Sequence, residues 1–157
     1  MKRNEELRRK IRWCGKQKDG IRLIEPNENL CKEYLKEADS TLDDLMRITS
    51  KWKLIMAYYA CYNALYALLL KAGIKSEIHT CTIALMAHIE GFDEEDIIFM
   101  ENLKDDRINA QYYLKKKELR DESKVKDFVL KCKKAAAALD SQKLRKELEG
   151  DIYYGEK

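Results

Sequence analysis

Apolar side chains recur at every third or fourth position along most of the chain, which is the spacing of one face of an α-helix. The segment from about Asn27 to Ser50 shows this pattern as one stripe, and Asn27 or Asn29 can serve as its N-cap. We therefore predict a long helix here that buries one face and exposes the other. The stripe consists of Leu30, Tyr34, Ala38, Leu42, Leu45 and Ile48.

The next segment, about 51–72, is apolar on all sides, and Gly73 follows it as a natural C-cap. A helix without a polar face lies at the centre of a bundle or in an oligomer interface. Its most apolar part, Leu54 to Leu70, contains Asn63 and four tyrosines. We therefore interpret it as a buried helix and predict no membrane span.

Shorter periodic segments predict further helices over residues 1–13, 77–90 and 121–139. An extended segment at 21–27 is expected because Pro26 disfavours helix in the residue before it. After the last helix the chain is strongly charged, and we expect it to fray.

One more helix is expected after Gly91, where Asp93 with Asp96 can cap its N-terminus. The pattern leaves open whether this helix ends before Asp105 or continues through Tyr113. The acidic run around the cap could hold a hard cation, but acidic residues gather at helix N-termini because of the helix dipole. We therefore predict capping here, and neither a metal nor a cofactor.

The short connections between these helices favour antiparallel neighbours. We predict an all-α fold, an up-and-down antiparallel four-helix bundle with additional short helices. Composition agrees, since one proline and six glycines in 157 residues are too few for an all-β domain. We divide the chain into a charged N-terminal helix and loop (1–27), the helical bundle (28–139) and a charged C-terminal tail (140–157).

The charges are nearly balanced: 31 basic and 28 acidic side chains give a net charge of +3. Such a chain has no overall field that would draw it to nucleic acid or to an anionic membrane. Contact with RNA would need a local basic patch, which residues 115–117 or 131–134 could supply. A solvated helix face is the commoner meaning of such lysines.

Five cysteines are scattered along the chain, and no two have the close spacing of a zinc or redox motif. Cys61 and Cys81 fall within apolar helical patterns, where a free thiol behaves as a small hydrophobic residue. We therefore expect free thiols and a cytoplasmic location. The N-terminus leads into no apolar run, so we expect no signal peptide.

No general catalytic motif is present: the chain lacks a glycine-rich phosphate loop, a nucleophile elbow and closely paired histidines. Two segments nevertheless draw attention. The first is the tyrosine-rich helix from Ala57 to Leu70, which is followed by Gly73 and His79-Thr80. The second is Asp105 to Tyr113, in which helical spacing places Arg107 and Gln111 on one face.

In this order, the two segments resemble the HEPN family (higher eukaryotes and prokaryotes nucleotide-binding). The resemblance spans residues 28–139 and is carried by Tyr58-Tyr59, Leu68-Leu69-Leu70, Gly73, His79-Thr80 and the segment 107–113. It implies a helical bundle that forms a homodimer, often beside a small nucleotidyltransferase. Active members are metal-independent ribonucleases that use an arginine and a histidine four to six residues later.

Arg107 matches the arginine of this motif, but Tyr112 and Tyr113 occupy the window of its histidine. A phenol, with an ordinary pKa of about 10, is a poor base at neutral pH. His79 could approach Arg107 in the folded bundle. In some toxin–antitoxin pairs of the family the transferase adds AMP to a tyrosine just beyond the motif, and Tyr113, less so Tyr112, would be that acceptor here.

Three functions remain open. The favoured one is a dimeric nucleotide-, RNA- or partner-binding module, one half of a pair with a nucleotidyltransferase, in which the ribonuclease motif is degenerate. The second is an active metal-independent ribonuclease toxin that uses Arg107 with His79 or Tyr112. The third is a helical interaction protein whose tyrosines only pack. The binding cleft is expected to contain Arg107, Asn109, Gln111, Tyr113 and His79.

Overall fold

A computed structural model of the protein describes residues 2–153, and most of them are helical, which confirms the all-α class. The two-residue strands β1 (Arg22–Leu23) and β2 (Ile74–Lys75) form one antiparallel ladder. The helices of this part of the chain are α1 (Lys2–Lys16), α2 (Glu28–Leu45), α3 (Lys51–Ala72), α4 (His79–Ala84), the 3₁₀ helix η1 (Leu85–His88), α5 (Glu94–Gln111), α6 (Glu122–Ala138) and α7 (Ser141–Tyr153).

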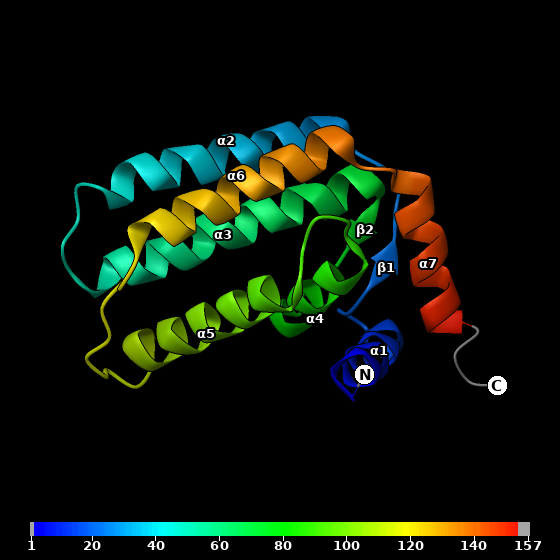
Figure 1. The fold of residues 1–157 in the computed structure, drawn as a ribbon, viewed down its shortest axis with the longest axis horizontal. Coiled ribbons are helices and arrows are strands. Elements are labelled where there is room, and N and C mark those ends of the chain that lie inside the picture. The colour runs from blue at the N-terminus through cyan, green and yellow to red at the C-terminus, as the bar shows by residue number, and fades with distance from the viewer. Residues whose placement is uncertain (1, 154–157) are drawn as a thin grey trace.

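Helix α3 is the centre of the fold. It contacts α2, α5, α6 and α7, and Figure 1 shows α2 and α6 running beside it while α5 lies on the other side. Ser50 caps its N-terminus, and Gly73 ends it in the left-handed conformation, as predicted. By length and composition α3 could cross a membrane, but 72% of its most apolar window is buried inside the protein. The structure thus confirms the prediction of a buried helix without a polar face.

The expected caps are present on α2 and α5. The Asn27 side chain accepts a hydrogen bond from the Leu30 amide at the start of α2. Asp93 and Asp96 form a reciprocal capping box at the start of α5, which confirms the capping interpretation of this acidic run. Helix α5 then continues without a break to Gln111, which answers the question that the sequence left open.

The helix predicted over 77–90 is shorter and is divided in two. The Glu77 amide donates to the Asp19 carbonyl, and Ile78 is still extended, so α4 begins only at His79. After six residues the chain tightens into the 3₁₀ helix η1. His79 therefore lies at the first helical position.

Cys81 is not a free thiol, which corrects the prediction: it forms a disulfide with Cys14 at a Cα–Cα distance of 5.8 Å. The bond joins the last turn of α1 to the first turn of α4, two helices that pack against each other. The two cysteines are 67 residues apart in sequence, so their spacing gave no sign of the pair. Cys31, Cys61 and Cys132 are free and buried, as expected of small hydrophobic residues.

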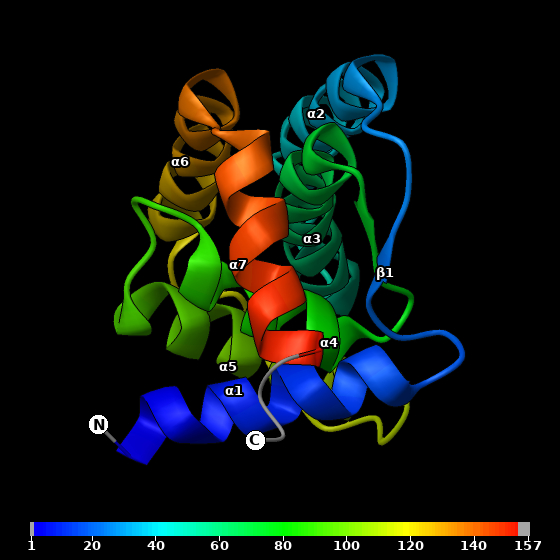
Figure 2. The same cartoon turned by 90° about the vertical axis from the view of Figure 1, so that its right-hand side faces the viewer.

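The charged segment after α6 does not fray between residues 141 and 153, so that prediction is also wrong. It forms α7, which buries Leu144 and Leu148 and packs on α1 and α3. Figure 2 shows α7 running from the end of α6 down to α1. Arg145 fastens it, because its Nη1 donates to the carbonyls of Ile24, Ala72 and Gly73 at 2.8–2.9 Å. Residues 154–157 of the predicted tail lie outside the described part of the chain.

We predict that Gly73→Ala destabilises the protein about 1–3 kcal/mol more than Gly91→Ala does. Both glycines have positive φ, +75° and +96°, so both variants carry the backbone cost of an alanine in this region. Only at Gly73 would the added methyl group collide with Arg145 and the Ile24 carbonyl; at Gly91 no atom of the described residues, apart from its chain neighbours, lies within 4 Å of it. Urea denaturation of the two variants measures the difference, and equal losses of stability would contradict this account.

Candidate functional site

Arg107 is the most unusual side chain of the interior, because only 7% of it is exposed and no carboxylate pairs with it among residues 2–153. Its Nη1 donates to the Tyr59 hydroxyl at 3.1 Å and to Gln111 Oε1 at 3.4 Å, both neutral acceptors. Its Nε is the one buried side-chain nitrogen or oxygen in the described residues that lacks a hydrogen bond. A positive charge is thus held inside the protein without an anion.

The sequence places this charge through helical spacing. Leu103, Arg107 and Ala110 are all buried on the face of α5 that packs against α3. The guanidinium therefore occupies a position where an apolar side chain would be expected. It lies over the rings of Tyr58 and Tyr59, with Cζ 4.7 Å and 5.5 Å from their centroids, which is cation–π geometry.

His79 reaches the same tyrosine from α4. Its Nδ1 lies 2.7 Å from the Tyr58 hydroxyl, and its ring stacks on Tyr62 with the centroids 4.1 Å apart. Tyr62 in turn shares a hydrogen bond with Thr82 one turn further along α4. Arg107 and His79 therefore both contact Tyr58, so three helices contribute to one site.

The aromatic rings continue away from this site along α3. Tyr58, Tyr62 and Tyr66 follow each other at four-residue spacing, and their rings stack at centroid distances of 5.8 Å and 6.0 Å. Tyr34 of α2 meets Tyr66 edge to face at 5.3 Å. The tyrosines of α3 therefore fill its interfaces with α2 and α4, and two of them also contact the Arg107 guanidinium.

Burial sets the charge states of the site. It raises the pKa of Tyr62 to about 12 and raises that of Tyr58 further, so both phenols keep their protons. Burial, followed by the charges of Arg107 and Lys104, lowers the pKa of His79 below its ordinary value. His79 is therefore neutral at pH 7, and Arg107 is the charged group among the four.

The structure brings together some of the predicted site residues and leaves others apart. His79 and Gln111 join Arg107 as described above. Asn109 is only partly buried, and it lies about 200° around α5 from Arg107 because a helix turns about 100° per residue. Tyr112 and Tyr113, which are 65% and 67% exposed, follow the end of α5, and neither forms a hydrogen bond or a cation–π contact with Arg107.

The predicted set of site residues did not include Tyr58 and Tyr59, the aromatic partners of Arg107. Both belong to the tyrosine-rich segment on which the resemblance to the HEPN family rests. Lys104, one turn before Arg107, was missed as well. The sequence could have indicated these partners through Arg107 itself. An arginine on the buried face of a helix needs hydrogen-bond or ring partners on the helix that packs against that face. Which residues of α3 supply them depends on the packing of α5 against α3, which no local pattern specifies.

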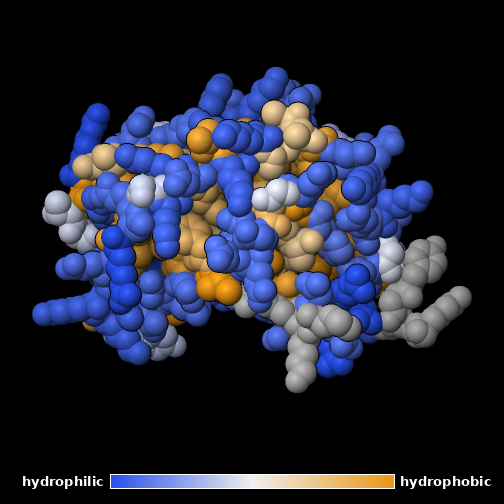
Figure 3. All heavy atoms as spheres, in the orientation of Figure 1, coloured by the Kyte–Doolittle hydropathy of each residue, from blue (hydrophilic) through white to orange (hydrophobic). Residues whose placement is uncertain are grey.

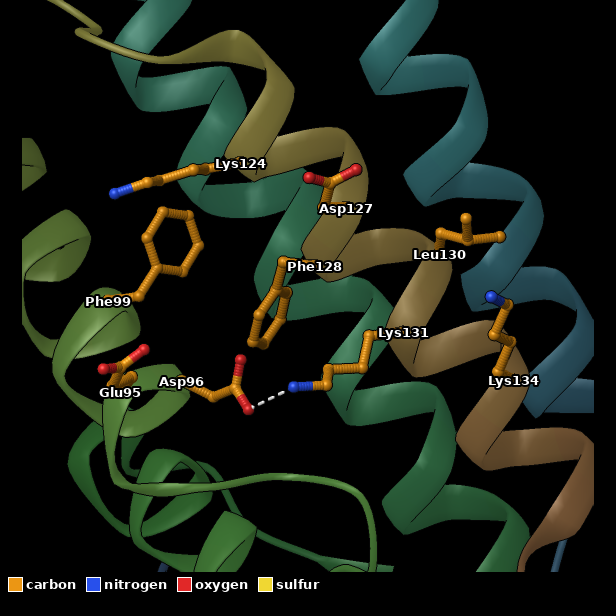
Figure 4. A pocket seen from close by; sticks show the side chains of 9 residues that line it. All are labelled: Glu95, Asp96, Phe99, Lys124, Asp127, Phe128, Leu130, Lys131 and Lys134. Atoms are coloured by element: carbon orange, nitrogen blue, oxygen red, sulfur yellow. Dashed lines mark hydrogen bonds and ion pairs between the residues drawn. The ribbon is translucent and has the colours of Figure 1, made fainter.

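The larger hollows of the surface lie elsewhere. One, of about 510 Å³, opens between α5 and α6, where Phe99 and Phe128 approach across the gap and Lys131 bonds Asp96 at 2.6 Å (Figure 4). Apolar surface shows between hydrophilic side chains near the centre of the face seen in Figure 3. A second hollow, of about 870 Å³, lies between α6, α7 and the turn after η1. Each is lined by three lysines and three carboxylates, so neither favours a ligand of one charge.

A scan against protein-family models finds no match to this chain, and a search of curated proteins finds none either.

We predict that His79 titrates below the ordinary histidine pKa and that Arg107→Gln raises its midpoint. Lys104→Gln should raise the midpoint less, while Arg120→Gln, in the loop before α6, serves as the control without effect. The unfolded chain binds this proton at a higher pH than the folded protein does. The free energy of unfolding therefore rises with pH in the region just below the ordinary histidine pKa. The contribution of neutral His79 is lost as the pH falls through this region. Proton NMR of the two histidines measures this, and a midpoint unchanged in Arg107→Gln would contradict it.

Proposed function

We propose that the protein is a HEPN-type dimeric module that binds a phosphate-bearing ligand, a nucleotide or RNA, at Arg107. The observation that carries this proposal is the buried guanidinium with neutral partners only. An ion removed from water costs several kcal/mol unless an opposite charge compensates for it. A phosphate group is the ligand that a guanidinium binds with the best geometry, through two parallel hydrogen bonds.

Two donor atoms are available for such a ligand. Within residues 2–153, Arg107 Nη2 and His79 Nε2 have no hydrogen-bond partner, and neither is among the buried unpaired atoms, so both reach solvent. Lys104, whose charge acts on His79, adds a second cation nearby. These three groups would surround an anion from α4 and α5.

The family resemblance supports the same proposal. In it, α2, α3, α5 and α6 form the up-and-down four-helix bundle, and two copies meet so that their Arg107 residues lie near the shared cleft. A nucleotidyltransferase is the proposed protein partner. Sedimentation analysis at micromolar concentration tests the dimer. A monomer would contradict the dimeric part of the proposal, and the ligand would then bind to one copy alone.

A cytoplasmic location belongs to this proposal. The disulfide is unusual in a reducing compartment. Both of its cysteines are fully buried, however, so reductant reaches them only when α1 separates from α4.

The second candidate is the ribonuclease. It is favoured by the neutral state of His79, an imidazole beside a guanidinium, since a neutral imidazole can accept the proton of a 2′-hydroxyl. Tyr112 is the poorer candidate for the base, because its side chain is 65% exposed and forms no hydrogen bond with Arg107. Cleavage of a mixed RNA pool in EDTA separates the two candidates: cutting that Arg107→Ala abolishes supports the ribonuclease, and intact RNA supports the binding module.

We predict that a saturating nucleotide or short RNA raises the melting temperature of the wild type and that Arg107→Gln loses this increase. At a ligand concentration of 100 times Kd the stabilisation is about 2.7 kcal/mol, or about 5–10 °C for a chain of this size. Arg107→Lys should keep part of it, because the charge remains while the paired geometry is lost. Arg120→Gln is the matched control. An equal increase in Arg107→Gln would contradict the proposed site.

We also predict that Tyr113 is the residue that a partner nucleotidyltransferase modifies with AMP. Its side chain is 67% exposed and lies just beyond α5, so an enzyme can reach it without unfolding the site. Intact-mass analysis after co-expression with the transferase and ATP reads the added nucleotide. Tyr113→Phe should prevent the addition and Tyr112→Phe should not. An unmodified wild-type chain would contradict the prediction.

A further inference from the structure

The Tyr58 hydroxyl has one hydrogen-bond partner among the described residues, and it is His79 Nδ1. Tyr58 is fully buried, so its proton cannot be given to solvent. Buried hydroxyl groups in proteins almost always donate to an acceptor. If Nδ1 carried the proton of the imidazole and donated to the phenol oxygen, the Tyr58 O–H would be left inside the protein without an acceptor. The arrangement that satisfies both groups has Tyr58 donating and Nδ1 accepting.

A neutral imidazole has a single N–H, and when Nδ1 accepts, that proton is on Nε2. We infer that Tyr58 is a positioning residue that fixes His79 as the Nε2–H tautomer. His79 then presents a hydrogen-bond donor to the ligand of the Arg107 site.

With this assignment, the two solvent-facing nitrogens of Arg107 and His79 are both hydrogen-bond donors. Arg107 offers Nη2 and His79 offers Nε2–H, while Arg107 Nε is unpaired but closed to solvent. The neighbouring phenols of Tyr58 and Tyr62 are already bonded to His79 and Thr82. A ligand oxygen without a proton, as on a phosphate or a carboxylate, satisfies these donors.

The same tautomer separates binding from cleavage. A base must accept a proton at the nitrogen that faces the substrate, and in this tautomer Nε2 already holds one. The identity of the ligand in this inference rests on the proposed function. The Nε2–H tautomer favours anion binding over ribonuclease chemistry at this site. The role of Tyr58 itself can be read without any ligand.

The test is nitrogen-15 NMR of histidine-labelled protein at pH 7.5 or above, roughly one unit over the ordinary histidine pKa. The chain has two histidines, and His88→Gln assigns their signals. Two-bond nitrogen–proton correlations tell a protonated ring nitrogen from an unprotonated one. The expected result for wild-type His79 is an unprotonated Nδ1 and a protonated Nε2.

Tyr58→Phe keeps the ring and removes the donor, so His79 should move toward a mixture of tautomers. Tyr62→Phe is the matched control, since Tyr62 stacks on the same imidazole but bonds Thr82 instead. It should leave the His79 tautomer unchanged. A protonated Nδ1 in the wild type, or a tautomer that Tyr58→Phe does not alter, would overturn the role of Tyr58.

Titration with inorganic phosphate then tests the ligand separately. A saturable shift of the His79 Nε2 signal in the wild type, absent in Arg107→Gln, supports donation to an anion. If the tautomer is as inferred but phosphate, a nucleotide and a short RNA leave Nε2 unmoved, the donor role toward an anion is wrong and the proposed function fails with it. In that result the positioning of His79 by Tyr58 still stands.

Discussion

Helix α3 has no polar face, and it is stable in water only when other helices cover it on every side. Helices α2 and α6 cover one side, α5 lies along another, and α7 closes the end near Gly73. At Gly73 this cover is tight, because the backbone of the Ile24–Pro26 segment and Arg145 both approach too closely for a side chain. The apolar helix thus requires a packed neighbour along each of its faces.

The site follows from the same constraint. Tyrosine buries a large ring and leaves one polar atom to be satisfied, so a core helix rich in tyrosine needs polar partners on the helices that cover it. Thr82 and His79 of α4 satisfy Tyr62 and Tyr58, and Arg107 of α5 bonds Tyr59. Arg107 has more N–H donors than its bond to the Tyr59 hydroxyl uses. The donors that remain without a partner, together with the positive charge, are the features of a binding site in this part of the core.

Much of this could be predicted from the sequence, and what could not depends on contacts distant along the chain. The bounds of α3, the caps at Asn27 and Asp93, and the all-α class follow from local patterns, which act within a few residues. The disulfide of Cys14 with Cys81 and the order of α7 depend on packing between segments far apart in the sequence. At the site, the pairing of Arg107 with Gln111 follows from helical spacing. The meeting of Arg107 with Tyr58 and His79 requires the arrangement of three helices.

We propose that the Arg107 guanidinium, which pairs with no carboxylate among residues 2–153, receives its anion from a ligand. The most direct measurement is nitrogen-15 NMR of the arginine Nε–H groups during a phosphate titration. Arg145 is the internal control, because the backbone carbonyls of Ile24, Ala72 and Gly73 already accept from its guanidinium. The account predicts a saturable shift of the Arg107 signal with little change at Arg145. Equal, unsaturable drifts of both signals, or no shift at Arg107, would contradict it.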